Sequence, residues 1–324
     1  MRAIRVHEQI GPKGLHVDEI ETPKPGAGEV LVDVRAAGVN FPEVLLSYGK
    51  YQFKPDVPFI PGGEAAGVIE AVGEGVTTLS VGDRVAFTMI HGAFAERVVT
   101  PELSAVKLPD EVPFEVGAVT LLTYATTWHA LVDRARIREG ETLLVLGASG
   151  GVGVSAIQLG KLFGARVIAA ASTPEKVEFC KRMGADEGIC YATEDLKDRA
   201  KDLTRGRGVD VVYDPVGGRF SEAALRAIAW EGRFLVVGFA SGEIPRVPLN
   251  LTLLKGCEIV GVFWGSFAMR EPEKNRAHCA EIFAHVAAGR LAPHLDVTLP
   301  FERVSEALER LERREVRGKV ALVP

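Results

Sequence analysis

The segment with the clearest chemistry is Gly147-Ala-Ser-Gly-Gly-Val-Gly153, which lies between an apolar run at 142–146 and a helical pattern starting at Val152. Glycine-rich turns of this kind let the backbone approach a pyrophosphate and direct the positive end of the following helix at the phosphates. Ala148, Gly150 and Gly153 take the small-residue positions of the Gly-x-Gly-x-x-Gly spacing. With a strand before it and a helix after it, the turn predicts a dinucleotide site in preference to a purely structural turn.

The residues after the next strand indicate which dinucleotide binds. A site specific for NAD places Asp or Glu about 20 residues further on, where it binds the ribose 2'-hydroxyl. Here the segment is Ala169-Ala-Ala-Ser-Thr173, without an acid. A carboxylate about 4 Å from a 2'-phosphate would cost on the order of 4 kcal/mol per charge. Its absence permits NADPH, with Lys176 as the cation and Ser172 and Tyr191 as hydroxyl donors; the alternative for Lys176 is an ordinary surface lysine.

Strands and helices alternate from about residue 142, which predicts a parallel, doubly wound sheet. The predicted strands are 142–146, 165–171, 209–213, 232–238 and 257–263, and helices are expected from Val152 onward, at 174–183 and at 220–230. The helix at 174–183 has Ser172 or Thr173 as its N-cap, Pro174 in its first position and Gly184 after its end.

The two ends of the chain have a different pattern. Residues 1 to about 110 contain short β-like runs such as 30–35 and 66–72, separated by Gly and Pro clusters, and predict a mainly β domain. Helical patterns at 273–288 and 302–314 precede a last apolar strand at 319–323. We expect this tail to rejoin the first domain.

Length and composition exclude several classes of protein. A chain of 324 residues predicts about two domains, and 47% hydrophobic with 25% charged residues is typical of soluble globular proteins. The net charge of -5 disfavours an electrostatic nucleic-acid binder. The apolar stretch 143–162 contains five glycines and fits a strand, a turn and a buried helix better than a membrane span. We expect a small-molecule partner, no nucleic acid and no membrane.

The cysteines and the first residues bear on the compartment. Cys180, Cys190, Cys257 and Cys279 form neither a disulfide framework nor a zinc lobe. The first eight residues turn acidic before any run that could be a signal-peptide core. We expect a reduced, cytoplasmic protein.

Further segments occur in an order and spacing that chance explains poorly. They are 36–43, 49–51, 60–67, 81–86, 148–153 and 212–218, which read AAGVNFPE, GKY, IPGGEAAG, VGDRVA, ASGGVG and VYDPVGG. In these segments nearly the whole chain resembles the zinc-independent medium-chain dehydrogenase/reductase family, and within it the quinone oxidoreductases related to zeta-crystallin. The resemblance implies an α/β protein with a GroES-like, mainly β catalytic domain at 1–122 and 265–324. It also implies a Rossmann domain, a doubly wound parallel sheet, at 123–264, with the active site in the cleft.

The resemblance also assigns roles to individual residues. Asn40, Glu43 and Tyr51 match catalytic positions near the nicotinamide and the substrate. The implied cofactor-binding residues are Thr126, Ala148, Ser149, Gly150, Gly151, Val152, Gly153, Ser172, Lys176, Tyr191, Gly238, Phe239, Ala240, Phe263, Trp264 and Gly265. For Phe263 and Trp264 the alternative is a plain core position. The strand at 257–263 resembles the one that pairs across the dimer in relatives, which implies a homodimer, with tetramers also open.

No metal site is expected. Zinc-dependent relatives bind catalytic zinc through a Cys, a His just before a Glu, and a second Cys. The matching positions here are Val39 or Asn40, Gly63 and Leu122, none of which is a zinc ligand. Without a metal to polarise an alcohol, alcohol dehydrogenation is not expected.

These observations predict an NADPH-dependent quinone oxidoreductase. A quinone is already electrophilic, so hydride transfer needs mainly correct positioning and exclusion of water. The alternative is an NADPH-dependent enal, enone or enoyl-thioester reductase, because related enoyl reductases have a tyrosine matching Tyr51 that is proposed as the proton donor. A more remote alternative is an NADPH-binding structural or RNA-binding protein, since zeta-crystallin relatives include both.

Overall fold

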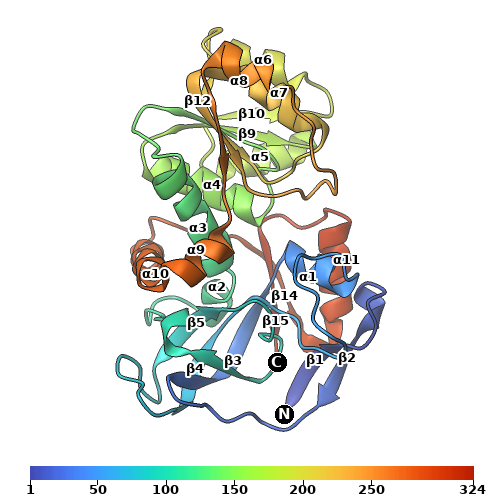
Figure 1. Cartoon of the computed structure of the whole chain (residues 1–324), viewed down its shortest axis with the longest axis vertical. Coiled ribbons are helices and arrows are strands. Elements are labelled where there is room, and N and C mark those ends of the chain that lie inside the picture. Colours follow the sequence, from blue (N-terminus) through green and yellow to red (C-terminus); the bar gives the residue numbers. More distant parts are fainter. The chain divides into compact units, whose positions relative to one another are not determined.

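The computed structural model describes residues 1–324 and divides into two compact units (Figure 1). Unit 1 consists of Met1–Leu122 and Ala268–Pro324, and unit 2 consists of Thr123–Phe267. The two ends of the chain therefore build one unit, and the middle of the chain builds the other.

Unit 2 contains a single sheet of six parallel strands. They are β8 (Thr142–Val145), β9 (Arg166–Ala171), β10 (Glu187–Cys190), β11 (Val209–Asp214), β12 (Ile228–Val236) and β13 (Glu258–Gly261). Their order across the sheet is β10-β9-β8-β11-β12-β13. The order reverses direction between β8 and β11, and in such sheets ligands bind outside the carboxyl ends of the strands at that point. The predicted doubly wound parallel sheet is confirmed.

Helices cover both faces of this sheet. They are α3 (Leu121–Trp128), α4 (Gly151–Leu162), α5 (Pro174–Arg182), α6 (Leu196–Leu203), α7 (Arg219–Ala227) and α8 (Asn250–Lys255), with a π-helical turn at His129–Arg134. In Figure 1, α4 and α5 lie on one side of the strands, and α6 and α7 lie on the other. Buried aliphatic side chains such as Ile168, Val212 and Leu225 fill the space between the strands and the helices.

One predicted helix was too long, and several helices were missed. The helix expected at 220–230 ends at Ala227, and Ile228 already begins β12. Between Val209 and Val211 of β11 the partner strand advances from Ile228 to Arg233, so β12 bulges outward there. Glu231 takes a left-handed conformation, φ 57°, inside this bulge. The predictions also omitted α6 and α8. The expected helix at 174–183 is confirmed as α5, with the Thr173 hydroxyl accepting the Lys176 backbone N–H.

Unit 1 contains a hairpin and a seven-stranded sheet. The hairpin pairs β1 (Arg2–Val6) with β2 (Leu15–Glu19). The sheet contains β3 (Glu29–Val39), β4 (Glu64–Val72), β5 (Arg84–Thr88), β6 (Arg97–Pro101), β7 (Ala105–Lys107), β14 (Leu295–Pro300) and β15 (Lys319–Val323). The long strand β3 pairs with β4, β6 and β15. The expectation that the tail rejoins the first domain is therefore confirmed.

Short helices and turns complete this unit. They are α1 (Phe41–Ser47), α2 (Phe114–Gly117), α10 (Pro272–Ala287) and α11 (Val304–Glu312), with 3-10 turns at Pro12–Gly14, Glu102–Ser104 and Phe301–Arg303. A last helix, α9 (Trp264–Arg270), crosses the boundary between the two units. The core of unit 1 mixes side chains from both chain ends, for example Val32 and Phe94 with Leu308 and Val320. None of the helices is long and apolar enough to cross a membrane.

Candidate functional site

The residues predicted to carry chemistry fall into two groups, one in each unit. Asn40, Glu43 and Tyr51 belong to unit 1, and the predicted cofactor-binding residues from Thr126 to Gly265 belong to unit 2. In each group, the strands place the residues that follow their ends close together.

Strand pairing brings three polar residues together in unit 1, although they are far apart in sequence. Gly38 of β3 is opposite Glu64 of β4, and Val39 is opposite Val320 of β15. Asn40 follows directly on β3, so it lies beside both Glu64 and Lys319, the first residue of β15. The Lys319 Nζ donates to Glu64 Oε1 at 2.8 Å and also to Asn40 Oδ1. All three side chains are buried.

The Asn40 amide is fully engaged inside this cluster. Its Oδ1 accepts from Lys319, and its Nδ2 donates to Glu64 Oε1 at 3.1 Å and to the Gly38 carbonyl at 3.3 Å. Both amide protons therefore already have acceptors within the unit. This arrangement makes Asn40 a residue that positions its neighbours, and a direct contact from its amide N–H groups to a substrate would first require these bonds to break.

Glu43 lies one helical turn further on and is also buried. Asn40 is the N-cap of α1, and its backbone N–H donates to Glu43 Oε2 at 2.7 Å, so the carboxyl closes the first turn of the helix. Burial raises the pKa of Glu43 from 4.5 to about 7, with Lys319 and the N–H of Asn40 opposing the rise and Glu64 adding to it. The group therefore holds or releases a proton close to neutral pH, as a general acid or base must.

Tyr51 is the third predicted residue of this group. Its half-buried ring packs against the core of unit 1 and lies 6.3 Å from the ring of Phe53, tilted by 48°. Burial, and secondarily the charge of Glu43, raise the pKa of the Tyr51 phenol. The phenol is therefore a hydrogen-bond donor at neutral pH, and ionisation of Glu43 makes it a weaker acid.

In unit 2, the glycine-rich turn joins β8 to α4, as predicted. The Cβ of any residue replacing Gly153 would lie 2.5 Å from the Gly147 carbonyl oxygen and 2.6 Å from the Ala148 backbone, so close packing excludes a side chain there. Gly150 differs, because its φ of -83° suits any residue and the nearest atom to an added Cβ would be 3.6 Å away. Neither conformation nor internal packing requires glycine at position 150. It is also the N-cap of α4 and makes no side-chain capping bond, which leaves the end of that helix bare.

Ser172, Lys176 and Tyr191 gather at the neighbouring strand ends. Cys190 of β10 pairs with Ala171 of β9, and the Tyr191 N–H donates to the Ala171 carbonyl at 3.1 Å, so Ser172 and Tyr191 follow adjacent strands. The Tyr191 ring packs on Phe220 with ring centroids 4.4 Å apart. Lys176 occupies the first turn of α5, directly after β9. The carboxyl ends of β8, β9 and β10 thus place the glycine turn, two hydroxyls and one lysine at one edge of the sheet.

Thr126 lies on α3, next to a buried cluster of hydroxyl groups. Thr127 Oγ1 is hydrogen bonded to Ser155 Oγ at 2.6 Å and to Tyr213 Oη at 2.8 Å, and it donates to the Thr123 carbonyl. Ser155 belongs to α4 and Tyr213 to β11, so the cluster ties α3 to the helix that begins at the glycine turn.

The predicted residues Gly238, Phe239 and Ala240 follow β12 in a loop that is hydrogen bonded to the loop after β11. The N–H groups of Val237 and Gly238 donate to the Asp214 carbonyl, and the Ala240 N–H donates to the Pro215 carbonyl. The buried Asp214 carboxylate holds the loop after β11 in place.

Three hydrogen bonds reach that carboxylate. Oδ1 accepts the N–H groups of Val216 and Gly217, both at 2.8 Å, and Oδ2 accepts the Ser221 hydroxyl at 2.6 Å. The motif at 212–218 therefore fixes the backbone against which Gly238 to Ala240 lie.

Phe263, Trp264 and Gly265 follow β13. Phe263 is 53% exposed, so the alternative of a plain core position is wrong for this residue, whereas Trp264 is half-buried. Trp264 and Gly265 form the first turn of α9, a helix that the sequence did not indicate.

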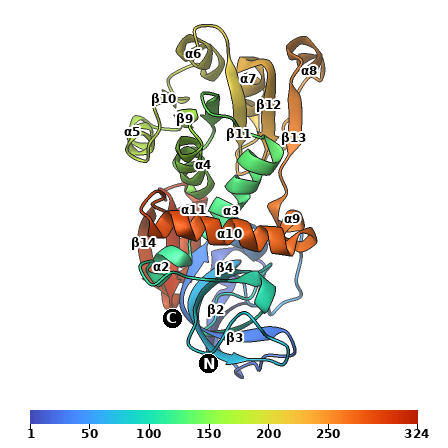
Figure 2. The same cartoon turned by 90° about the vertical axis from the view of Figure 1, so that its left-hand side faces the viewer.

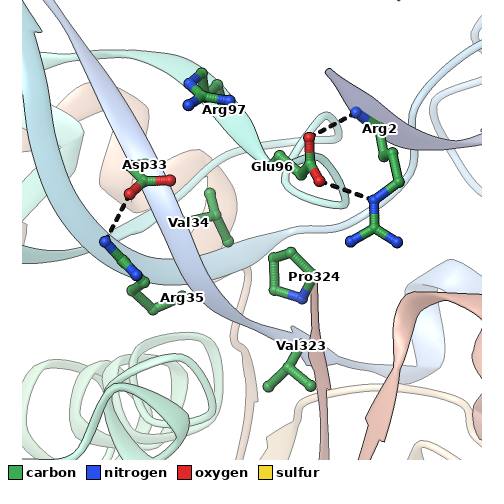
Figure 3. A pocket seen from close by; sticks show the side chains of 8 residues that line it. All are labelled: Arg2, Asp33, Val34, Arg35, Glu96, Arg97, Val323 and Pro324. Carbon is green, nitrogen blue, oxygen red and sulfur yellow. Dashed lines mark hydrogen bonds and ion pairs between the residues drawn. The ribbon is translucent and has the colours of Figure 1, made fainter. Parts of the chain in front are cut away.

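A separate pocket of about 370 Å³ lies at the end of β15 (Figure 3). It is lined by Arg2, Asp33, Val34, Arg35, Glu96, Arg97, Val323 and Pro324. Its guanidinium groups are paired with carboxylates, Arg2 with Glu96 and Glu302, Arg35 with Asp33, and Arg97 with Glu70. None of the predicted site residues lines this pocket, and its charges are internally compensated.

Comparison with known proteins establishes the family. Residues 26–110 match the model of the alcohol dehydrogenase GroES-like domain, and residues 151–279 match that of the zinc-binding dehydrogenase. The chain is 36% identical over 324 residues to the quinone oxidoreductase-like protein 2 homolog of Nematostella vectensis, covering 99% of this chain and 88% of that protein. It is 34% identical over 314 residues to the quinone oxidoreductase of Homo sapiens, covering 96% and 94% of the two chains.

A solved structure agrees with these relatives. The Escherichia coli quinone oxidoreductase, solved as a complex with NADPH, matches with a TM-score of 0.93 and 30% identity over 100% of each chain. The chain belongs to the quinone oxidoreductase-like medium-chain dehydrogenases/reductases. The family recognised from the sequence and its two-part α/β fold are therefore confirmed, and the family is one of oxidoreductases.

The name of the zinc-binding dehydrogenase model raises the question of whether this member of the family has zinc ligands. The three positions that would carry them do converge in unit 1. Glu64 Oε2 accepts the Leu122 N–H at 2.9 Å, and a Cβ on Gly63 would lie 3.2 Å from both Leu122 Cδ1 and Glu43 Oε1. Asn40, Gly63 and Leu122 offer no thiolate or imidazole, and no three His, Cys, Asp or Glu side chains anywhere in the chain are arranged to hold a metal ion. The residues at these positions do not fit a catalytic zinc.

Sequence reasoning missed three residues that organise the site. Glu64 and Asp214 lay inside recognised motifs without a role, and Lys319 counted only as the start of a strand. A lysine that opens an otherwise apolar strand, Lys319-Val-Ala-Leu-Val323, was the one available signal that a buried charge needed a partner.

The raised pKa of Glu43 predicts how stability depends on pH. The folded protein binds the Glu43 proton more tightly than the unfolded chain does. The contribution of this group to the free energy of unfolding is therefore complete below about pH 4.5 and declines as pH rises toward about 7. The total loss from this group is on the order of 3 kcal/mol. Glu43→Gln should remove this part of the decrease in the free energy of unfolding with pH, as measured by urea unfolding at about pH 5 and about pH 8.

The exposed Glu74 provides the control, and Glu74→Gln should leave the slope as it is in the wild type. An undiminished slope in Glu43→Gln would show that Glu43 titrates like an ordinary carboxyl.

Proposed function

We propose that this protein is an NADPH-dependent oxidoreductase that transfers hydride to a quinone without a metal ion. The observation that carries the cofactor assignment is the edge of the unit 2 sheet. There the first turn of α4 has no side-chain cap, and neither conformation nor packing requires the glycine at position 150. The neighbouring segment 169–173 contains no acid and is followed by Lys176, with Tyr191 at the end of the next strand. The Escherichia coli relative solved with NADPH supports the same choice.

The residues of unit 2 would hold the parts of NADPH as follows. The N-terminal N–H groups of α4 would bind the pyrophosphate, since that helix end carries positive potential and has no side-chain cap. Lys176, Ser172 and Tyr191 would bind the 2'-phosphate. Thr126, the loop at 238–240 and the segment 263–265 would bind the nicotinamide and its ribose. When bound, NADPH supplies the hydride.

The residues of unit 1 would orient and protonate the acceptor. Tyr51 would donate a hydrogen bond to a carbonyl oxygen, and Glu43 would hold a proton near neutral pH. Asn40 would act by holding the first turn of α1 and the Glu43 carboxyl. A quinone fits this donor set because its reduction needs neither a Lewis acid nor a strong general acid, and the named relative from Homo sapiens is a quinone oxidoreductase.

The second candidate is reduction of an enal, enone or enoyl thioester. One observation favours it, namely the buried Glu43 carboxyl, which is still protonated in part at pH 7. Reduction of a conjugated alkene places a proton on carbon, which solvent does slowly, so a positioned acid contributes more there than with a quinone.

Two glycine substitutions separate the proposed cofactor site from the fold. Gly150→Ala fits the backbone, so the melting temperature should stay within about a degree of the wild type, while the new methyl group at the bare end of α4 should weaken NADPH binding at least about tenfold. Gly153→Ala forces contacts of 2.5 Å. It should cost about 1–3 kcal/mol and lower the melting temperature by several degrees.

Calorimetric titration with NADPH and thermal unfolding provide both measurements. Unchanged NADPH affinity in Gly150→Ala would contradict the placement of the pyrophosphate.

Substitution of Tyr51 distinguishes the two acceptors. If the acceptor is a quinone, Tyr51→Phe should change kcat less than about threefold. With crotonaldehyde, kcat should fall by about 100-fold or more if Tyr51, and not Glu43, delivers the proton to carbon. Steady-state oxidation of NADPH gives both values. Tyr48→Phe is the matched control, because the Tyr48 hydroxyl donates to Glu312 at 3.0 Å and takes no part in the proposed site. Equal losses on both acceptors in Tyr51→Phe would exclude it as a proton donor.

We also infer that the protein is a homodimer through the outer edge of β13. Figure 2 shows β13 and α8 at one side of unit 2, and no strand of the chain pairs with the far edge of β13. Four large apolar side chains nearby are 67–80% exposed, namely Trp230, Leu249, Leu253 and Leu254. A second copy adding its own β13 would pair the free backbone groups and cover this apolar surface.

Leu253→Asp tests this inference. It should convert a dimer of twice 34.8 kDa into a monomer in sedimentation velocity. The control is Leu103→Asp, since Leu103 is an exposed leucine of unit 1 and should leave the dimer intact. A wild type that sediments as a monomer at micromolar concentration would contradict the inference.

We infer a reducing compartment such as the cytoplasm for this enzyme. All four cysteines are free, and Cys180, Cys190 and Cys279 are buried. Burial raises the pKa of Cys180 and of Cys279 to about 12, which keeps these thiols unreactive.

A further inference from the structure

Lys319 is the buried cation at the centre of the unit 1 cluster. Its side chain is 6% exposed and that of Glu64 is 1% exposed, with 2.8 Å between Nζ and Oε1. Lysine is almost never buried to this extent without a partner. A buried ion pair is on average no more stabilising than apolar residues of the same volume, so stability alone does not explain why the chain places a lysine here.

The hydrogen bonds of Lys319 fix the orientation of Asn40. With Oδ1 bound to the ammonium, the amide must turn its Nδ2 toward Glu64 and the Gly38 carbonyl. The backbone N–H of the same Asn40 donates to Glu43. A short chain of contacts therefore runs from β15 through Asn40 to the Glu43 carboxyl.

The charge of Lys319 also acts on Glu43 through space. Burial and the charge of Glu64 on β4 disfavour the ionised carboxylate, whereas Lys319 on β15 and the backbone N–H of Asn40 favour it. The Tyr51 phenol, which follows α1, is the other titratable group beside Glu43, and the charge of Glu43 raises the pKa of Tyr51. Lys319 is the largest of the influences that oppose burial. Without it, two buried carboxyl groups would share the cluster with no cation.

We propose that Lys319 is a positioning residue of the acceptor site, which through Asn40 and through its charge controls how tightly Glu43 holds a proton. The inference rests on the proposed function, because Glu43 acts on an acceptor only if unit 1 binds one. It predicts that the last strand of the chain sets the pH at which the site changes its protonation.

The direct test is carbon NMR of the protein labelled at the glutamate side-chain carboxyl, with the Glu43 signal identified by its loss in Glu43→Gln. In the wild type this signal should titrate with a midpoint near pH 7. In Lys319→Met the midpoint should rise by at least about one pH unit, a tenfold change in proton affinity. Lys107→Met is the control, because it removes an exposed lysine paired with Asp83 and should leave the midpoint unchanged.

A double variant covers the case in which Lys319→Met does not fold. Lys319→Met combined with Glu64→Gln leaves no uncompensated buried charge while Glu43 is protonated. Its midpoint should still rise, by less than in the single variant, because Lys319 outweighs Glu64 at Glu43. A midpoint that stays in place or falls in the variant that folds would overturn the proposal.

The pH profile of kcat then shows whether this control reaches the reaction. With NADPH and crotonaldehyde, whose reduction depends most on a positioned acid, the profile of Lys319→Met should shift in the same direction as the NMR midpoint. Turnover of 1,4-naphthoquinone is measured alongside. A midpoint that moves while the profile stays fixed would overturn the role in the reaction. A wild type that turns over neither acceptor would instead refute the proposed function and leave the NMR result standing.

Discussion

The ion pair between Lys319 and Glu64 is the interaction on which the organisation of unit 1 depends. It joins the last strand of the chain to β4, and Asn40 at the end of β3 bridges the two. Because side chains alternate along strands, a shift of one residue in the pairing of β15 with β3 would turn Lys319 away from the cluster. The pairing of Val320 with Val39 therefore fixes both the fold and the chemistry of this unit. The surroundings of Glu43 depend on this arrangement, because the Glu43 carboxyl accepts a hydrogen bond from the backbone N–H of Asn40.

The candidate site of unit 2 is built mainly from backbone groups, in contrast to the buried side chains of unit 1. It depends on backbone groups at the carboxyl ends of parallel strands, where loops from β8, β9, β10, β11 and β12 meet. Side chains are absent where the backbone must come close, as at Gly153, and a buried carboxylate at Asp214 holds the loop beside β12. Unit 2 thus supplies a polar backbone surface suited to phosphate, whereas unit 1 supplies ionisable side chains in a region from which water is largely excluded.

How much of this could be read from the sequence depended on whether the signal was local. The glycine turn, the caps of α5 and the strand at 319–323 are local patterns, and the structure contains each of them. The end of α7 was misplaced because the bulge in β12 is decided by pairing with β11 and not by nearby residues. Lys319 and Glu64 are 255 positions apart, so only the strand register reveals that they meet. Asn40 was singled out from the sequence as a candidate catalytic residue, but its hydrogen bonds to Lys319 and Glu64 became visible only when all three residues were placed.

The central claim is that the two groups of residues serve one reaction, the reduction of an electrophilic acceptor by NADPH. The most direct measurement is the steady-state oxidation of NADPH, compared with NADH, by a panel of small and large quinones, simple enals and enones, and crotonyl-CoA. We expect turnover of a quinone with a clear preference for NADPH, because the strand end before Ser172 carries no acid to bind a 2'-hydroxyl and Lys176 follows it. Tight binding of NADPH without its oxidation by any acceptor, or equal use of NADH, would contradict it.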